Sequence, residues 1–337
     1  MPSHDLIVIG AGIAGLACAR EARAAGLSPV VLERSRGVGG RCATFRLDGQ
    51  PVDHGVPFLH GSAPGFVAEW GRVDAEPLLG WPRAVRGEGP PCQPNAFSPR
   101  EERIAYGLGL SAFAKHLARD LDVRLGTLVT GLASGGGEIV VAVEDGSEHR
   151  APRVALALPV EQALRQLVAL GAASRTARAV TKLLAPIGSR PCLTVIAGYP
   201  GDVPRPDWEL WQPEDSSVLQ TLVHDSSKRK DPRRRVLVLQ APPCWSRQHL
   251  DAPPEEWTAE IVREAGRLAG DWAARPEVTR PQRWRYARAD GGSELSLPVM
   301  LELDGATLGI AGECFAPGGG TQAAYLSGIA LASRLTG

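Results

Sequence analysis

The stretch Asp5-Leu6-Ile7-Val8-Ile9-Gly10-Ala11-Gly12-Ile13-Ala14-Gly15 decides the fold of this chain. A short apolar run of strand length leads into closely spaced glycines, and an alanine-rich helical stretch follows over residues 16–25. A second apolar run, 30–32, ends on Glu33. This order of strand, glycine turn, helix, strand and acid is the setting in which G-x-G-x-x-G indicates a dinucleotide-binding unit.

Each glycine of this turn has a predicted physical role. Gly10 permits the tight turn, Gly12 lets the backbone approach a pyrophosphate, and Gly15 lets the helix pack closely on the strand. The helix N-terminus, which includes Ile13 and Ala14, offers free N–H groups and partial positive charge to the same pyrophosphate. An ordinary βα turn with incidental glycines is the alternative, and the agreement of context and spacing disfavours it.

An acid and a second glycine-rich turn extend the pattern. Glu33 is placed to accept hydrogen bonds from both ribose hydroxyls, and it would repel a 2′-phosphate, which argues against NADP in this pocket. Arg36-Gly37-Val38-Gly39-Gly40-Arg41 follows with two cations, a turn that an NAD dehydrogenase does not need. This turn resembles the R-x-G-G-R segment that follows the ribose acid in FAD-dependent amine oxidases, and the resemblance implies that Arg34, Gly40 and Arg41 join the cofactor site.

The composition is that of an ordinary globular protein. Of 337 residues, 44% are hydrophobic and 22% are charged, and 37 basic residues balance 37 acidic ones. The chain starts too close to the first strand for a signal peptide, and no apolar run reaches the roughly eighteen residues of a membrane span. The six cysteines show no metal-binding spacing. We therefore expect a cytoplasmic monomer or weak dimer with no metal and no nucleic-acid or membrane partner.

The rest of the chain alternates between βα and all-β character. The pattern predicts a hairpin over 47–52 with Asp48-Gly49 at its turn, and a helix over 110–121 with Ser111 as N-cap. A β-meander should follow over 123–151, then a buried parallel strand over 154–158. Further expected elements are helices 160–170, 258–274 and 321–335 and strands 193–197, 217–224, 235–240, 282–287 and 307–311. Residues 61–104 are poorly periodic and are interpreted as an excursion into another domain.

The chain resembles the renalase-like branch of the FAD-dependent amine oxidase superfamily, nearly from end to end. The residues that carry the resemblance are the Gly10–Glu33 fingerprint, Arg36–Arg41, Asp53-His54-Gly55, Tyr106-Gly107-Leu108-Gly109-Leu110-Ser111, Asp225-Ser226-Ser227-Lys228, Arg283-Trp284-Arg285-Tyr286-Ala287, and Ala311-Gly312-Glu313 with Gly318-Gly319-Gly320. The resemblance implies an α/β fold, with a Rossmann-type FAD-binding domain and a second, mixed-sheet α+β substrate domain. The predicted division gives 1–60, 105–185 and 290–337 to the first domain, and 61–104 and 186–289 to the second.

The resemblance also assigns roles near the end of the chain. The acid Glu313, with Gly312, would reach the ribityl and phosphate region of FAD. Gly320, Gln322 and Ala323 at the start of the last helix would face the flavin pyrimidine, where a helix N-terminus stabilises the anionic reduced ring. An exposed acid after an edge strand is the alternative for Glu313. Val129 is added to the cofactor site on the same resemblance. Cys314 lies too far downstream to match the family's covalent anchor, so we expect non-covalent FAD.

The catalytic candidates are His54, Phe58, Trp284 and Tyr286. Trp284 and Tyr286 alternate on one face of a strand with Gln282, which suits either a platform for a planar substrate or simple core packing. His54, like His60, could flank the active site, although lone histidines are more often structural.

Two further stretches bear on the substrate. The cationic run 228–235 is interpreted as a solvated hairpin tip rather than a phosphate clamp. Two departures from the branch put the substrate in doubt: Pro57 stands where an amide residue is usual, and Asp225 replaces an asparagine.

These observations predict a flavoprotein oxidase in which a substrate C–H gives a hydride to flavin N5 and O2 reoxidises the flavin to give H2O2. The resemblance implies a 2- or 6-dihydro isomer of NAD(P) as the substrate, which needs no strong general base. Two alternatives stay open. One is an amine oxidase that acts on a small amine, and the other is a non-catalytic FAD-binding protein whose substrate domain has drifted.

Overall fold

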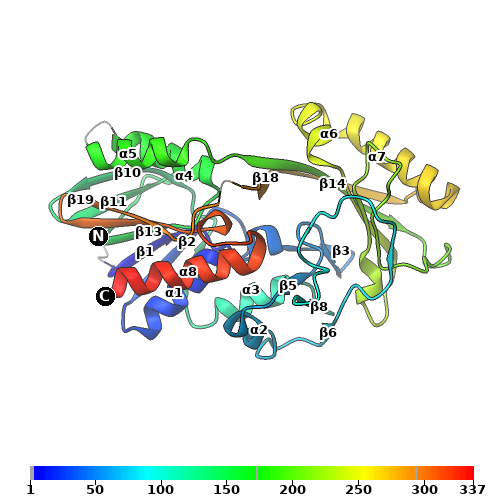
Figure 1. Cartoon of the computed structure of the whole chain (residues 1–337), viewed down its shortest axis with the longest axis horizontal. Helices are drawn as coiled ribbons and strands as arrows, with labels where there is room; N and C mark the ends of the chain where they lie inside the picture. Colours follow the sequence, from blue (N-terminus) through cyan, green and yellow to red (C-terminus); the bar gives the residue numbers. More distant parts are fainter. Residues whose placement is uncertain (1–3, 172–173, 293) are drawn as a thin grey trace. The chain divides into compact units, whose positions relative to one another are not determined.

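The computed structural model describes residues 4–171, 174–292 and 294–337 (Figure 1). The chain divides into two compact units, each assembled from separate segments. Unit 1 comprises residues 1–40, 113–189 and 289–337, and unit 2 comprises 41–112 and 190–288. The units differ from the predicted division at 41–60 and 105–112, which lie in unit 2 because their backbone and side chains bond to its other segments. They also differ at 186–189 and 289, which lie in unit 1.

Unit 1 is built on a six-stranded sheet with the order β19-β20-β13-β1-β2-β9. Its strands are β1 (Leu6–Ile9), β2 (Pro29–Glu33), β9 (Asp122–Leu125), β13 (Arg153–Leu156), β19 (Val299–Leu303) and β20 (Ala306–Ile310). All neighbours pair in parallel except β19, which runs antiparallel at one edge. The carboxyl ends of the five parallel strands therefore share one edge of the sheet, where doubly wound folds bind their ligands.

The two faces of this sheet are covered differently. On one face, residues such as Ile7, Val30 and Leu308 share a core with the antiparallel sheet of β10 (Val129–Gly135), β11 (Glu138–Val143) and β12 (Glu148–Ala151). The same core takes in α4 (Val160–Gly171) and α5 (Arg175–Leu184). Helices α1 (Ile13–Ala24) and α8 (Gly320–Thr336) pack side by side (Figure 1). The result is the layered α/β architecture that the sequence predicted.

Unit 2 has a mixed sheet with the order β18-β14-β17-β16-β15-β7. The strands are β7 (Val85–Arg86), β14 (Ser189–Tyr199), β15 (Leu210–Trp211), β16 (Thr221–His224), β17 (Arg235–Gln240) and β18 (Val278–Ala289). β7 pairs in parallel with β15, whereas β14, β16 and β17 pair antiparallel. Helices α6 (Pro243–Gln248) and α7 (Pro254–Ala269) and the 3-10 helix η3 (Asp271–Ala274) belong to the same unit.

Smaller elements complete the two units. The hairpin of β3 (Thr44–Leu47) and β4 (Gln50–Asp53) turns at Asp48-Gly49, as predicted. A second small sheet joins β5 (Leu59–Gly61), β8 (Glu102–Tyr106) and β6 (Pro77–Leu79), and α2 (Pro64–Trp70) follows β5. The 3-10 helices η1 (Gly40–Cys42), η2 (Asp225–Lys228) and η4 (Glu313–Phe315) are single turns. α3 (Ser111–Leu117) ends earlier than the predicted 121, and Ser111 is its first residue rather than its N-cap.

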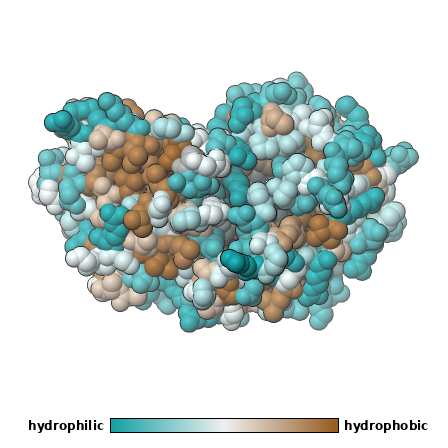
Figure 2. Space-filling view, in the orientation of Figure 1, coloured by the Kyte–Doolittle hydropathy of each residue, from teal (hydrophilic) through white to brown (hydrophobic). Residues whose placement is uncertain are grey.

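Large apolar side chains are exposed at several of the described positions, among them Leu79, Val168 and Leu297. Figure 2 shows hydrophobic residues gathered on the visible face of unit 1, over the region where Figure 1 labels β19 and β11, with hydrophilic residues around them. Most of a folded surface is apolar even in ordinary monomers, so this distribution requires no partner. Among the described helices, none is long and apolar enough to cross a membrane.

Candidate functional site

Two glycines of the first turn are required by the fold of unit 1. A Cβ atom at Gly10 would lie 2.6 Å from the carbonyl oxygen of Ala157, and Gly10 has φ +104°. A Cβ at Gly15 would lie 2.0 Å from the carbonyl oxygen of Gly10. Helix α1 can therefore start directly on the end of β1 only because both positions lack a side chain.

Gly12 is different, because a Cβ at this position would meet no described atom within 4 Å. Its φ of −75° is open to any residue, so neither packing nor backbone conformation requires a glycine here. The position lies at the N-terminus of α1 and bridges to Gly39 of the second glycine turn, whose N–H donates to the carbonyl of Ala11 (2.8 Å). The open space beside Gly12 is what a pyrophosphate on a helix N-terminus would use.

Glu33 braces this turn at the end of β2. Its two carboxylate oxygens accept from the N–H groups of Ala11 and Ser35, each over 2.8 Å. Each oxygen keeps a second lone pair, and the side chain is half-buried. Glu33 can thus hold the glycine turn in shape and still accept from ribose hydroxyls.

The last βα turn lies at the same edge of the sheet. Glu313 is 7% exposed, and its Oε1 accepts from the N–H of Ala289 (3.0 Å). The alternative of an exposed acid after an edge strand is wrong, because β20 has neighbours on both sides. Ser327 of α8 bonds both to the N–H (3.0 Å) and to the carbonyl (2.8 Å) of Gly312, which fixes the helix to the turn.

Helix α8 begins at the last of three consecutive glycines with positive φ, at 318, 319 and 320. A Cβ at Gly320 would meet no described atom within 4 Å. Further along, a Cβ at Gly328 would lie 2.2 Å from the carbonyl oxygen of Ala14, so α8 packs closely against the start of α1. Sequence reasoning missed Ser327 and Gly328, because only their partners, Gly312 and Ala14, which lie 15 and 314 residues away, reveal what they do.

These features fit an adenine dinucleotide bound at the carboxyl edge of the unit 1 sheet. The first turn of α1 would hold the pyrophosphate, and Glu33 would hold the ribose. The start of α8, where Gln322 and the buried Ala323 lie, would hold the ring system of the cofactor. Val129 is buried at the start of β10, two residues after Thr127, whose N–H donates to the carbonyl of Glu33 (2.9 Å). In the described part of the chain, no group of three or more His, Cys, Asp and Glu side chains is placed to hold a metal.

The other residues assigned to the cofactor lie at the ends of the second turn. Arg34 is exposed after β2, and Gly40 is an exposed position in unit 1, where a Cβ would lie 3.6 Å from the Cα of Gly12. Arg41 falls in unit 2, where its Nη1 donates to the carbonyl of Ala287 (3.2 Å).

Two of the catalytic candidates meet in unit 2. The His54 imidazole stacks on the Trp284 indole, with ring centroids 5.3 Å apart, and Phe45 packs edge-on against His54. The Trp284 Nε1–H donates to the backbone carbonyl of His54 (3.0 Å). A Cβ at Gly55 would lie 2.2 Å from the carbonyl oxygen of Arg41 and 3.1 Å from Cζ2 of Trp284. The backbone at Gly55 therefore lies close to both Arg41 and the Trp284 ring.

Phe58 has no exposed surface. It packs against Trp81, Phe97 and His60 within the core of unit 2. Tyr286 is half-buried, two residues after Trp284 on β18. His60 lies beside Glu101, with its Nδ1 2.8 Å from the carboxylate. Among the candidates, the structure brings together His54 and Trp284, while Phe58 supports the segment from inside.

Burial lowers the pKa of His54 below its ordinary value, and the negative charges of Asp53 and Asp225 offset only part of that effect. Its Nδ1 is buried without a hydrogen-bond partner among the described residues. Burial likewise lowers the pKa of His60 in spite of the hydrogen bond with Glu101. His54 is therefore a neutral imidazole near pH 7.

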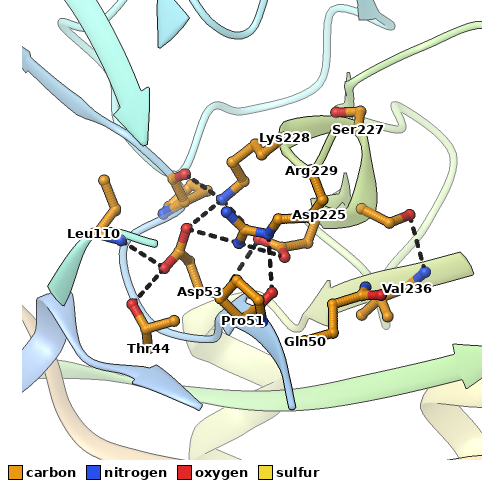
Figure 3. A network of polar contacts seen from close by, with 12 residues as sticks. Thr44, Gln50, Pro51, Asp53, Leu110, Asp225, Ser227, Lys228, Arg229 and Val236 are labelled. Atoms are coloured by element: carbon orange, nitrogen blue, oxygen red, sulfur yellow. Dashed lines mark hydrogen bonds and ion pairs between the residues drawn. The ribbon is translucent and has the colours of Figure 1, made fainter. Parts of the chain in front are cut away.

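Three motifs of the family resemblance converge on Asp53, as Figure 3 shows. Its Oδ1 accepts from the Leu110 N–H (2.8 Å) and from the Thr44 hydroxyl (2.7 Å), and its Oδ2 lies 2.7 Å from Lys228 Nζ. Lys228 and Arg229 each also pair with Asp225 (2.6 and 2.8 Å). These four charged residues, at 53, 225, 228 and 229, are called the buried charge network below.

The buried charge network corrects the prediction for the cationic run. Lys228 and Arg229 are 2% and 8% exposed, so the run begins in the core and not in a solvated tip. Burial alone would raise the pKa of Asp53, but the charges of Lys228 and Arg229 and its hydrogen bonds hold that pKa below the ordinary value. The four charges sum to zero, which is the condition for keeping them in the interior.

The fold and the nucleotide site define a two-unit flavoprotein. Residues 8–69 match the model of the NAD(P)-binding Rossmann-like domain, and residues 94–336 match that of the flavin containing amine oxidoreductases. The second match covers most of the chain, which therefore belongs to the flavin containing amine oxidoreductase family and uses FAD.

The chain is also similar to individual proteins. It is 41% identical to pseudooxynicotine dehydrogenase of Pseudomonas sp over 66 residues, which are 20% of this chain and 13% of that protein. It is 35% identical to a putative flavin-containing monooxygenase, FMO GS-OX-like 11, of Arabidopsis thaliana over 149 residues, which are 43% of this chain and 83% of that protein.

Solved structures share the whole fold. Wild-type putrescine oxidase bound to putrescine has a TM-score of 0.71 at 16% identity, with 99% of each chain covered. Cyclohexylamine oxidase from Brevibacterium oxydans IH-35A has a TM-score of 0.73 at 15% identity, again with 99% of each chain covered. The predicted fold class is thus confirmed.

Proposed function

We propose that this chain is an oxidase of 2- or 6-dihydro isomers of NAD(P), with His54, Trp284 and Tyr286 as the residues that contact the substrate. The bound FAD would supply the hydride acceptor and pass the electrons to O2 to give H2O2. A dihydronicotinamide is already an activated hydride donor, so the protein needs to orient it rather than to deprotonate it. Neutral His54 and the lack of an unpaired carboxylate among the residues described around it suit such a reaction.

The proposal is carried by one face of β18. Alternation along the strand places Arg280, Gln282, Trp284, Tyr286 and Arg288 on the same side. Arg280 lies over the ring of Phe45, with its Cζ 5.4 Å from the ring centroid, and Trp284 stacks on His54. Each arginine is four residues from Trp284, about 13 Å along a strand. This pattern of cations flanking flat rings suits a planar ring with phosphates at a distance.

The charge of β18 bears on the choice between substrates. The strand carries four arginines and no acid. The nearest acids of the adjoining segment, Asp53 and Asp225, are already neutralised in the buried charge network. Positive charge disfavours a protonated alkylamine and attracts phosphate. Each guanidinium has five N–H donors. Arg288 donates one of them to the carbonyl of Cys92 (2.8 Å), so donors remain for a phosphate.

Oxidation of a small amine is the second candidate. It is supported by the family of the chain and by the fold shared with the putrescine and cyclohexylamine oxidases. In either case we propose that FAD is held non-covalently by the turn at Gly10–Gly15, by Glu33 and by the turn at Gly312–Ala323. Cys314, 6% exposed, would not be its anchor.

Rapid mixing without oxygen tests the proposal. The FAD-loaded protein is mixed with 2- and 6-dihydro isomers of NAD and NADP, and separately with putrescine and cyclohexylamine, while the flavin absorbance is followed. Bleaching by the dihydro isomers, with H2O2 formed on later addition of O2, is the expected result. Bleaching by an amine alone would establish the second candidate. FAD retention without bleaching by any donor would identify a non-catalytic FAD-binding protein.

Substitutions of the flanking arginines test the phosphate contacts. Arg280→Gln and Arg288→Gln should weaken binding of the dihydro dinucleotide at least tenfold, because each removes a charged hydrogen-bond donor. The same changes should leave binding of the phosphate-free dihydronicotinamide riboside within about twofold. Arg263→Gln, an exposed position on α7, is the matched control. Equal effects on both ligands would contradict the phosphate role.

A further inference from the structure

Lys228 holds both ends of the segment that carries His54. Its Nζ lies 2.7 Å from Oδ2 of Asp53, and it donates to the backbone carbonyl of Pro57 (2.9 Å). The side chain is fully buried, and its Nζ lies over the ring of Trp81, 4.7 Å from the centroid. A single ammonium group thus closes residues 53–57 into a loop. Figure 3 shows its contact with Asp53.

The side chains before Lys228 fix the ammonium in place. The Ser226 hydroxyl accepts from the N–H of Val236 (3.1 Å), and the Ser227 hydroxyl accepts from the Trp81 indole N–H (3.2 Å). Asp225 accepts from the backbone N–H of Asp53 (3.2 Å) and pairs with Lys228. Ser226 and Ser227 are therefore anchored to Val236 and Trp81, and Asp225 contacts both Lys228 and the 53–57 segment itself.

The middle of this loop is held by contacts with other residues. The Trp284 indole N–H donates to the carbonyl of His54, and Gln240 Nε2 donates to the carbonyl of Gly55 (2.7 Å). The N–H of Val56 donates to the carbonyl of Arg41 (2.9 Å). The contacts of β18 and β17 act on the middle of the loop, and those of Lys228 act on its two ends.

We propose that Lys228 is a positioning residue, which fixes the ends of the 53–57 loop and thereby sets the place of His54 against Trp284. Its role in turnover rests on the function proposed above, whereas its role in the loop does not. Proline suits position 57 because Lys228 contacts only the backbone carbonyl of this residue. Asp225 suits this arrangement because a second buried acid balances the second buried base.

A pair of charge-balanced double variants separates positioning from charge balance. Lys228→Met with Asp225→Asn removes the loop contact and leaves the pair of Asp53 and Arg229. Arg229→Met with Asp225→Asn removes one charge of each sign as well, but it leaves the contacts of Lys228 with Asp53 and Pro57. Both variants lose one acid and one base from the same interior.

Hydrogen exchange of the FAD-loaded protein, measured by mass spectrometry on peptides that span 53–58, gives a readout that needs no substrate. We expect at least tenfold faster exchange there in the Lys228→Met double variant and little change in the Arg229→Met double variant. Flavin reduction by a 6-dihydro isomer of NAD should slow at least tenfold in the first variant only, since small misplacements of contact residues cost that much. Equal exchange in the two variants would overturn the proposal.

The unmodified protein provides a second test that does not depend on how the variants fold. The chain has only four lysines, at 115, 182, 228 and 230. With 15N-labelled lysine, one ammonium signal with slow proton exchange is expected at neutral pH, and its absence would also overturn the proposal. If no donor bleaches the flavin of the unmodified protein, the proposed function fails, while the two exchange measurements still decide the role of Lys228.

Discussion

The indole nitrogen of Trp284 donates to the backbone carbonyl of His54, 3.0 Å away, although the two residues lie 230 positions apart in the chain. The same pair of residues stacks ring on ring. β18 therefore contacts both the main chain and the side chain of His54.

Trp284→Phe keeps a stacking ring and removes the donor. The free energy of unfolding should fall by about 1–3 kcal/mol, because the carbonyl of His54 loses its partner in a half-buried place. Exchange of the amides at 53–58 should become faster. Urea unfolding and hydrogen exchange measure the two effects, with Trp272→Phe, a half-buried tryptophan of η3, as the control. Equal behaviour of the two variants would remove the role of the Trp284 donor.

Gly55→Ala should destabilise the same segment. The added Cβ would lie 2.2 Å from the carbonyl oxygen of Arg41, which is backbone and cannot move away cheaply. A loss of about 1–3 kcal/mol in the free energy of unfolding is expected from such overpacking. Gly65→Ala in α2, where a Cβ meets no described atom, should gain up to about 1 kcal/mol from helix propensity. Thermal melts of both variants check the contrast.

Gly12→Ala and Gly15→Ala should separate cofactor binding from folding. At Gly12 the new methyl meets open space, so the apoprotein should keep its stability within about 0.5 kcal/mol while FAD binding weakens at least tenfold. At Gly15 the methyl would collide with the carbonyl of Gly10, so the apoprotein itself should lose about 1–3 kcal/mol. Urea unfolding of the apoproteins and FAD titration provide the test. A Gly12→Ala variant with wild-type FAD affinity would contradict the placement of the pyrophosphate.

His224 should make the protein sensitive to mild acid. Burial, with the charge of Arg235, lowers the pKa of this histidine from 6.5 to about 4. Between these pH values the unfolded chain binds a proton that the folded chain does not, so stability falls as the pH drops from 6.5 toward 4. The shift corresponds to a loss of about 3 kcal/mol once the pH is below both values. His224→Gln should flatten this part of the stability profile measured by urea unfolding, and an unchanged profile would contradict the role of His224.

The sequence predicted the parts of the fold that depend on local pattern. The Gly10–Glu33 unit, the Asp48-Gly49 hairpin and the buried strand at 153–156 follow from spacing over a few residues. The helices α2, α5 and α6 were not predicted. α2 and α6 are only seven and six residues long, and α2 lies in a stretch with weak periodicity. Long elements with clear periodicity are the ones that sequence patterns identify reliably.

The candidate site could be predicted from the sequence only where a residue contacts groups that are close to it in the chain. The role of Glu33 follows from its distance to the glycine turn. The partners of Lys228 do not, because Asp53 lies 175 residues away and a run of basic residues ordinarily indicates a solvated surface. The one local signal was its position four residues after the buried strand 221–224.

The zero sum of the buried charge network also constrains how this protein can change over time. Losing any one of Asp53, Asp225, Lys228 and Arg229 leaves an uncompensated charge in the interior, at a cost of about 3–5 kcal/mol, comparable to much of a domain's whole stability. Replacements at these positions should therefore be inherited in pairs of opposite charge. Among descendants of this chain, the state of residue 225 should be statistically tied to that of residues 228 and 229, more than a hundred and seventy positions after the acid at 53 that they share.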